Sequence, residues 1–136
     1  MAEASPGGRA PPLSPHVQVW RWHVTMTASI LHRATGAALY AGALILVGWA
    51  LALASGDEAY GRYAAVLDSL PGKIVLFGVT VSVFFHLANG IRHLAWDAGA
   101  GFTPSTADRT AWAAMVIAVV AAAGLWVLLA MPVSVG

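Results

Sequence analysis

Long uncharged stretches separate the few charged residues of this chain and predict three membrane-spanning helices. There are 23 uncharged residues between Arg33 and Asp57, 18 between Lys73 and Arg92, and no charged side chain after Arg109. A helix needs about 20 apolar residues to cross a hydrocarbon core about 30 Å thick, and Lys73 can extend its ammonium outward where the stretch is short. We expect helices at about 29–54, 72–98 and 107–131.

Turn-forming residues connect these predicted helices. The segments 54–57 and 68–72 are rich in Ser, Gly, Asp and Pro, and they bracket a short surface segment that can itself be helical. Ser105 or Thr106 is expected to cap the third helix. The fold class predicted is an all-α membrane protein, with an N-terminal cytoplasmic or interfacial segment over residues 1–28 and a three-helix anchor domain over residues 29–132.

Composition agrees with a membrane protein and excludes several functions. Hydrophobic residues make up 59% of the chain and charged residues 10%, whereas about 25% charged is usual in soluble domains. A net charge of +1 leaves no basic surface for nucleic acid. With no cysteine, the chain can form neither a disulfide nor a thiolate metal site, and it cannot hold an iron–sulfur cluster by itself. Any redox cofactor must be held by other side chains.

The distribution of basic residues predicts the orientation in the membrane. Five of the seven lie before or at the start of the first predicted helix, or near the loop between the second and third, and only Arg62 and Lys73 lie on the other side. Basic residues favour the cytoplasmic side, so the N-terminus is expected in the cytoplasm or in the matrix of an organelle.

His86 is the most informative residue of the second predicted helix because it lies deep within an uncharged run. An imidazole at this depth needs a hydrogen-bond partner or a metal, since burying its nitrogens unpaired costs several kcal/mol. One interpretation is a histidine hydrogen-bonded between helices. The other is ligation of a haem iron by the neutral imidazole. As no second histidine is predicted at this depth, a haem with two histidine ligands would need its second ligand from another chain.

His93 and Asp97 follow on the same helix. His93 lies seven residues after His86 and therefore on the same helix face, with Gly90 between them allowing a flat macrocycle or another backbone to approach. His93 and Asp97 are spaced four residues apart, which suits a salt bridge at the helix end or, alternatively, a role in proton uptake. Both residues are secondary candidates.

Ser29, His32 and Arg33 form a second polar group at the start of the first predicted helix. Their spacing places a hydroxyl, an imidazole and a guanidinium on one helix face at the membrane boundary. A quinone head group needs donors, a charge to stabilise the developing anion and a source of protons. Arg33 could equally bind a haem propionate or a lipid phosphate. In the simplest alternative Arg33 anchors the helix at the interface and Ser29 caps it.

These motifs together resemble the family of cytochrome b556 subunits of succinate dehydrogenase, the C-type membrane anchors of respiratory complex II. Two departures from the pattern of that family are Pro11, which stands where an Arg is often found, and His23, which stands where a Pro is common. The resemblance covers most of the chain and is carried by Pro12 to His16, Trp20-Arg21-Trp22, Thr25 to Gly36 and His86 to Asp97.

The resemblance implies specific roles for the candidate residues. His86 would be the axial haem b ligand from this subunit, with the second histidine from a companion D-type anchor. Ser29 and Arg33 would help to bind ubiquinone, and His32 would lie near a haem propionate. A flavoprotein subunit and an iron–sulfur subunit would be further partners, and succinate oxidation would take place on the flavoprotein rather than on this chain. The location implied is the bacterial inner membrane, or alternatively the mitochondrial one.

Three other interpretations stay open at this point. A fumarate reductase anchor would share these features, because the direction of electron flow depends on the potentials of the partners. A purely structural anchor would need neither His86 at depth nor the polar face at Ser29. A small transporter is disfavoured, since the third predicted helix has no charged residue within its apolar run.

Overall fold

The computed structural model describes residues 21–131, which form four helices joined by short connections. They are α1 (Val24–Ala54), α2 (Asp57–Asp68), α3 (Leu70–Asp97) and α4 (Pro104–Ala130), and no strand occurs among these residues. By length and composition, α1, α3 and α4 can each cross a membrane. The predicted fold class, all-α with three membrane-spanning helices, is therefore confirmed. The Pro12 to His16 motif, Arg9 and Trp20 lie outside the described residues, as does Pro132 at the end of the predicted anchor domain.

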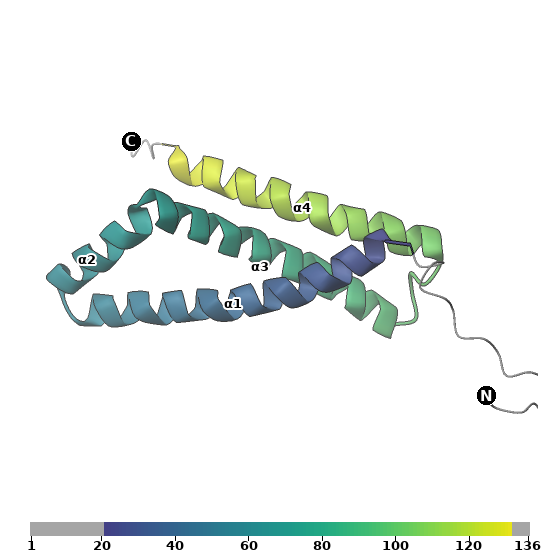
Figure 1. Ribbon diagram of the computed structural model, residues 1–136, viewed down its shortest axis with the longest axis horizontal. Helices are drawn as coiled ribbons and strands as arrows, with labels where there is room; N and C mark the ends of the chain where they lie inside the picture. The colour runs from purple at the N-terminus through teal and green to yellow at the C-terminus, as the bar shows by residue number, and fades with distance from the viewer. Residues whose placement is uncertain (1–20, 132–136) are drawn as a thin grey trace, which may run out of the picture.

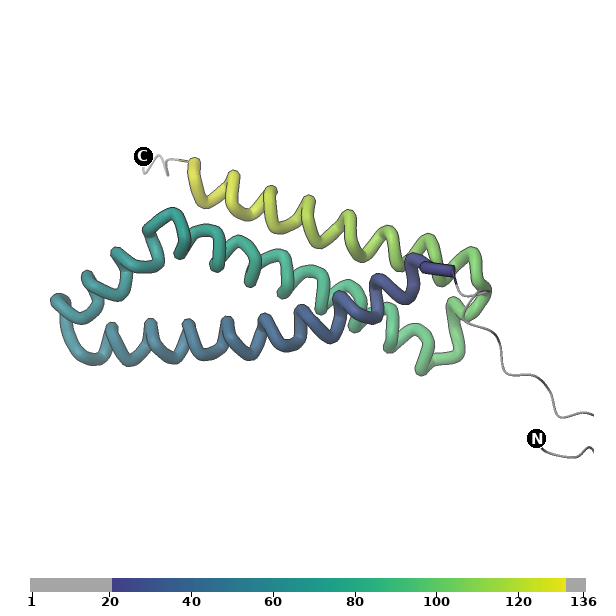
Figure 2. Tube along the Cα trace, in the orientation of Figure 1, coloured from purple at the N-terminus to yellow at the C-terminus, as the bar shows by residue number. Residues whose placement is uncertain are grey.

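The three long helices form an elongated bundle in which α3 packs against both α1 and α4 (Figure 1). α2 closes one end by linking α1 to α3, so that these three helices trace a narrow triangle (Figure 2). The start of α1, the end of α3 and the start of α4 lie together at the opposite end. This arrangement brings the two candidate motifs, from the first and second spans, to one end of the bundle.

α1 begins at Val24, five residues earlier than the sequence boundary of about 29. His23 precedes it with an extended backbone (φ −131°, ψ 148°). Ser29 therefore lies inside the helix, and the interpretation of Ser29 as a helix cap is wrong. The sequence boundary was set by the charge of Arg33, but a helix can continue past a charged residue once it leaves the hydrocarbon layer.

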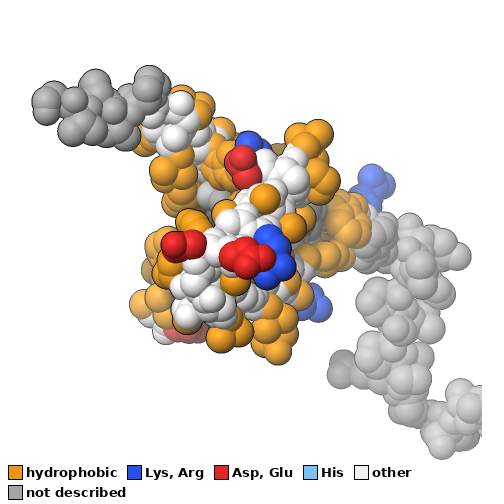
Figure 3. Space-filling model, turned by 90° about the vertical axis from the view of Figure 1, so that its left-hand side faces the viewer, with side chains coloured by type: hydrophobic (Ala, Val, Ile, Leu, Met, Phe, Trp, Pro, Cys, Tyr) orange, Lys and Arg blue, Asp and Glu red, His pale blue; other side chains and the backbone are white. Residues whose placement is uncertain are grey.

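Polar residues gather where α2 meets α3. Ser69 caps α3, because its Oγ accepts a hydrogen bond from Gly72 N at 3.2 Å. Lys73 and Asp68 form an ion pair across the junction, with Nζ and Oδ1 2.9 Å apart. Viewed from this end, acidic and basic side chains cluster among apolar ones (Figure 3). The short helical segment expected between the first two spans is thus present as α2.

Two glycines turn the chain from α3 into α4. Gly99 and Gly101 have φ values of 82° and 83°, in the left-handed region that glycine adopts without a steric penalty. Thr103 is the N-cap residue of α4 and Pro104 begins the helix, so the prediction that Ser105 or Thr106 caps it is wrong. Pro is well suited to the first helical position, because its φ is already helical and its missing N–H has no partner there.

Small residues allow α4 to pack closely against its neighbours. Phe85 of α3 and Ala28 of α1 belong to the same buried cluster as three alanines of α4. Most other apolar side chains of α1 are exposed, which suits contact with lipid or with another chain. The buried residues of α4 are Ala111, Ala114, Ala118 and Ala122.

Candidate functional site

His86 is half-buried on α3 and faces α1. Its Nδ1 lies 3.3 Å from the hydroxyl oxygen of Thr35. That hydroxyl has one proton, which it shares with backbone carbonyls of its own helix, the nearer being Leu31 O at 2.8 Å. The network therefore assigns Nδ1 of His86 as the donor to Thr35. The lone pair is left on Nε2, which has no hydrogen-bond partner within residues 21–131.

His32 of α1 stacks on both histidines of α3. Its ring stacks on that of His86, with centroids 3.9 Å apart and an angle of 13° between the planes. It also stacks on the ring of His93, with centroids 5.0 Å apart and an angle of 19° between the planes. We call these three side chains the histidine stack. The sequence placed His32 at the membrane boundary and His86 alone at depth, whereas the structure brings the two rings into direct contact.

The histidine stack presents ring faces to one another, so its nitrogens do not converge on one point. Within the described residues, no group of three or more His, Cys, Asp or Glu side chains is arranged to hold a metal ion. The nitrogen Nδ1 of His32 is buried without a hydrogen-bond partner in this part of the chain. An unpaired buried nitrogen carries a free-energy cost, which is typical of functional sites.

A close approach between helices holds His86 in place. A Cβ atom added at Gly36 of α1 would lie 3.3 Å from Cε1 of His86, closer than most real contacts. Gly36 therefore leaves the space that the imidazole uses. Gly90 differs, because an added Cβ there would meet nothing of this chain within 4 Å. The expectation that Gly90 admits a macrocycle or another backbone stays a prediction.

Ser29 and Arg33 interact directly on the exposed face of α1. Arg33 Nη2 donates a hydrogen bond to Ser29 Oγ at 3.2 Å. The two residues line a shallow hollow of about 290 Å³ together with Thr25, Met26 and Ile30. The hollow has an apolar wall and a polar edge with one fixed positive charge. His32 precedes Arg33 in the sequence, so the hollow and the histidine stack share one segment of α1.

His93 and Asp97 do not form the salt bridge that their spacing suggested. The Nδ1 atom of His93 lies 2.7 Å from the backbone oxygen of Asn89, one turn earlier, and donates its proton there. Asp97 is exposed at the end of α3, and it takes part in none of the ion pairs between described residues. A role for Asp97 in proton uptake stays a prediction.

Arg92 and Asn89 are buried polar residues that the sequence analysis did not single out. Arg92 is 7% exposed and Asn89 is fully buried. Arg92 bridges α3 to α4 through Thr110, with Nε and Oγ1 3.0 Å apart. Arg92 was counted as a loop residue, because its charge served to mark the end of a span. The neighbouring polar pair at positions 89 and 92, one turn apart, was the available signal.

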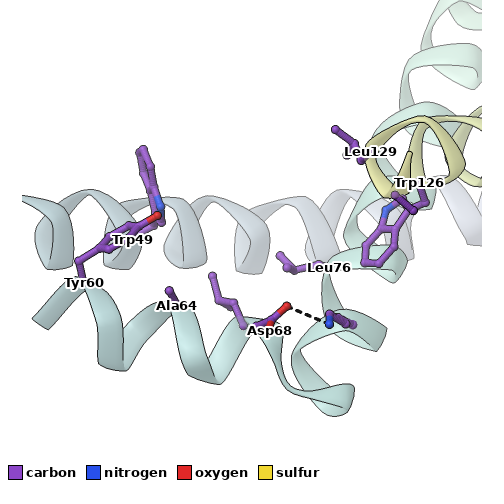
Figure 4. A pocket seen from close by; sticks show the side chains of 10 residues that line it. Trp49, Tyr60, Ala64, Asp68, Leu76, Trp126 and Leu129 are labelled. Carbon is purple, nitrogen blue, oxygen red and sulfur yellow. Dashed lines mark ion pairs between the residues drawn. The ribbon is translucent and has the colours of Figure 1, made fainter. Parts of the chain in front are cut away.

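Another cavity lies at the other end of the bundle. It has a volume of about 600 Å³ and is lined by residues from all four helices, including Trp49, Tyr60 and Trp126 (Figure 4). The ion pair of Asp68 and Lys73 lies at its edge. None of the candidate residues lines this cavity. Because size alone does not supply redox or proton chemistry, the histidine stack and the adjoining hollow are the stronger candidate site.

The chain is similar to curated proteins from bacteria and mitochondria. It is 40% identical over 116 residues to a succinate dehydrogenase cytochrome b556 subunit of Rickettsia felis, covering 85% of this chain and 90% of the relative. It is 37% identical to the subunit of the same name in Paracoccus denitrificans, covering 90% and 92%. It is 36% identical to the mitochondrial succinate dehydrogenase cytochrome b560 subunit of Sus scrofa, covering 84% and 69%.

A family profile covers nearly the same region. The profile described as succinate dehydrogenase/fumarate reductase transmembrane subunit matches residues 8–125, which include both candidate motifs and all three membrane-spanning helices up to Leu125. The resemblance found from the motifs is thereby confirmed. This chain belongs to the family of transmembrane subunits of succinate dehydrogenase and fumarate reductase.

Proposed function

We propose that this chain is a membrane anchor of succinate dehydrogenase that contributes one ligand to a haem b and part of a ubiquinone site. The observation that carries the proposal is the orientation of His86, which donates through Nδ1 to Thr35 and keeps Nε2 free. The names of the similar proteins favour succinate oxidation as the physiological direction. A fumarate reductase anchor is the alternative within the same family.

The donor set at His86 fits a haem. A neutral imidazole whose Nδ1–H is hydrogen-bonded and whose Nε2 is free has the form that metal-ligating histidines usually take. Haem bound there would supply one-electron transfer between the iron–sulfur subunit and quinone. Thr35 would hold the imidazole at a fixed angle about its helix. Gly36 would keep the neighbouring backbone clear of the ring.

The second haem ligand is proposed to come from a companion D-type anchor. Two histidines that held one iron would each have to direct a ring nitrogen to one of two ligand positions, so that the two nitrogens would converge on the metal. His32 and His86 are stacked face to face at 3.9 Å, so they cannot fill these two positions together. His32 instead lies where its ring can support His86, and it is the residue of this chain proposed to lie near a haem propionate. His93 extends the same stack.

Ser29 and Arg33 are proposed to bind the quinone head group in the hollow on α1. Since Arg33 donates to Ser29 Oγ, the serine proton is free to be donated to a quinone oxygen. The guanidinium supplies a fixed positive charge that stabilises the anion developing on that oxygen. Met26 and Ile30 offer apolar contact to the quinone ring. The hollow is open, as expected of a site completed by other subunits.

The remaining assignments concern location and partners. We propose an inner-membrane protein with a cytoplasmic N-terminus, which places the histidine stack near the cytoplasmic side. A flavoprotein subunit would oxidise succinate and an iron–sulfur subunit would deliver electrons to this end of the bundle. The division into an interfacial segment over residues 1–28 and an anchor domain is part of the same proposal. The chain itself would catalyse no reaction alone.

Purification of the complex tests this function. A tag on this chain should recover a flavoprotein, an iron–sulfur protein and a second membrane subunit, identified by mass spectrometry. The reduced-minus-oxidised spectrum of the preparation should show a low-spin haem b, and the complex should reduce ubiquinone with succinate. Recovery of the other subunits without any haem would support a structural anchor instead. Fumarate reduction faster than succinate oxidation would favour the alternative direction.

A further inference from the structure

Arg92 on α3 is a buried cation held by neutral groups. Its nitrogens donate to Thr110 Oγ1 at 3.0 Å, to Ala107 O at 3.1 Å and to Asn89 Oδ1 at 3.3 Å. It forms no ion pair with any residue in the range 21–131, and Asp108, which acts on it from a greater distance, is paired with His23.

A cation in this setting is costly for a purely structural role. Burying a guanidinium without a carboxylate in contact is unfavourable, particularly near the hydrocarbon layer. A neutral side chain could fasten α3 to α4 at a lower cost. The presence of a positive charge at this buried position therefore indicates that the charge itself contributes to the site.

A continuous series of contacts leads from Arg92 to the histidine stack. Arg92 holds the side-chain oxygen of Asn89, which is fully buried. The backbone oxygen of Asn89 accepts the Nδ1 proton of His93 at 2.7 Å. This bond fixes the tautomer of His93, leaving its lone pair on Nε2. His93 then stacks on His32, and His32 stacks on His86.

Trp96 provides a second route between the same residues. The guanidinium of Arg92 lies over the Trp96 ring, 4.0 Å from its centroid, in a cation–π arrangement. Trp96 also forms a T-shaped contact with the His93 ring, with centroids 5.1 Å apart. His93 is thus held on one side by the backbone oxygen of Asn89 and on another by Trp96, and Arg92 contacts both of these residues.

We propose that Arg92 is a positioning residue for the histidine stack and that its charge sets the reduction potential there. The proposal rests on the proposed function, in which His86 ligates haem b. A positive charge close to a redox centre stabilises the form that carries the additional electron, so Arg92 raises the midpoint potential. By fixing the His93 ring, Arg92 also fixes the position of His32, which stacks on His93, and through His32 the position of His86.

The test compares variants in membranes that contain all subunits. Arg92→Gln removes the charge and keeps two donors, Arg92→Lys keeps the charge and loses the planar fork, and Arg109→Gln is the matched control at an exposed position of α4. The readouts are the haem midpoint potential, the low-spin electron paramagnetic resonance signal, and kcat and KM for ubiquinone.

Charge and positioning have different signatures in this comparison. Arg92→Gln should lower the midpoint potential and shift the resonance signal, whereas Arg92→Lys should recover most of the potential but not the signal. Arg109→Gln should match the parent. Parent values of both the potential and the signal in Arg92→Gln would overturn the proposal.

A milder variant decides the question if Arg92→Gln does not assemble. Thr110→Val removes one acceptor of Arg92 without changing any residue of α3. Because it keeps the charge, it should shift the resonance signal and leave the midpoint potential near the parent value. A parent resonance signal in Thr110→Val would then overturn the proposal. The proposed function is tested separately, because it fails if His86→Leu keeps an unchanged haem, whatever the Arg92 variants show.

Discussion

The imidazoles of His32 and His86 lie face to face, with ring centroids 3.9 Å apart. His32 belongs to α1 and His86 to α3, so this contact joins the helix that carries Ser29 and Arg33 to the helix that carries the proposed haem ligand. We therefore expect a change in the hollow on α1 to affect His86 through His32. The proposed quinone and haem sites share one packing unit at one end of the bundle.

Enlarging Gly36 should disturb His86. In Gly36→Val the added side chain meets Cε1 of the imidazole, since a Cβ alone would lie at 3.3 Å. Overpacking of this kind costs about 1–3 kcal/mol, and the haem spectrum should change. Gly78→Val on α3 is the control, because a Cβ there meets nothing within 4 Å. A haem spectrum of Gly36→Val that matches those of Gly78→Val and the parent would show that Gly36 does not determine the position of the His86 imidazole.

Ser29→Ala and Arg33→Leu should slow ubiquinone reduction while the complex stays assembled. Loss of a donor or charge that stabilises a developing anion costs on the order of 100-fold in other enzymes, and less where subunits share the site. Succinate oxidation with an artificial acceptor that bypasses quinone should persist. The measurement is both rates in the same membranes, after haem and subunit content have been checked. Parent rates with ubiquinone would reduce Arg33 to an interfacial anchor.

The proposed orientation can be measured by labelling, because the chain has no cysteine of its own. A single cysteine in Asp57→Cys, at the start of α2, should react with an impermeant reagent only from the outer side. A single cysteine in Ala100→Cys, between α3 and α4, should react only from the cytoplasmic side. The reverse pattern would show that the distribution of basic residues misplaced the N-terminus.

The sequence predicted the membrane-spanning helices well. Charged residues are costly in hydrocarbon, so the long uncharged stretches of this chain mark its spans. The prediction was less accurate at helix ends, where no membrane cost applies. Using the charge of Arg33 as a boundary placed the start of α1 too late. The hydroxyls of Ser105 and Thr106 led to the wrong cap for α4, where Thr103 is the N-cap residue and Pro104 is the first helical residue.

The candidate site was predicted residue by residue but not as an arrangement. Position along each helix identified His86 and the Ser29 and Arg33 pair. The stacking of His32 on His86 depends on how α1 crosses α3, which local spacing does not encode. The burial of Arg92 was missed for a related reason, since a charged residue near a helix end is normally exposed and only the packing of α4 covers it.

The most direct test of this account is the haem spectrum of His86→Leu. Low-temperature reduced-minus-oxidised spectra and redox titration should be recorded on purified complexes of the parent, His86→Leu and the control Arg109→Gln, at an exposed position of α4. The account predicts that His86→Leu loses the low-spin haem b or shifts its midpoint potential and spectrum, while Arg109→Gln retains both. A parent spectrum and potential in His86→Leu would contradict it.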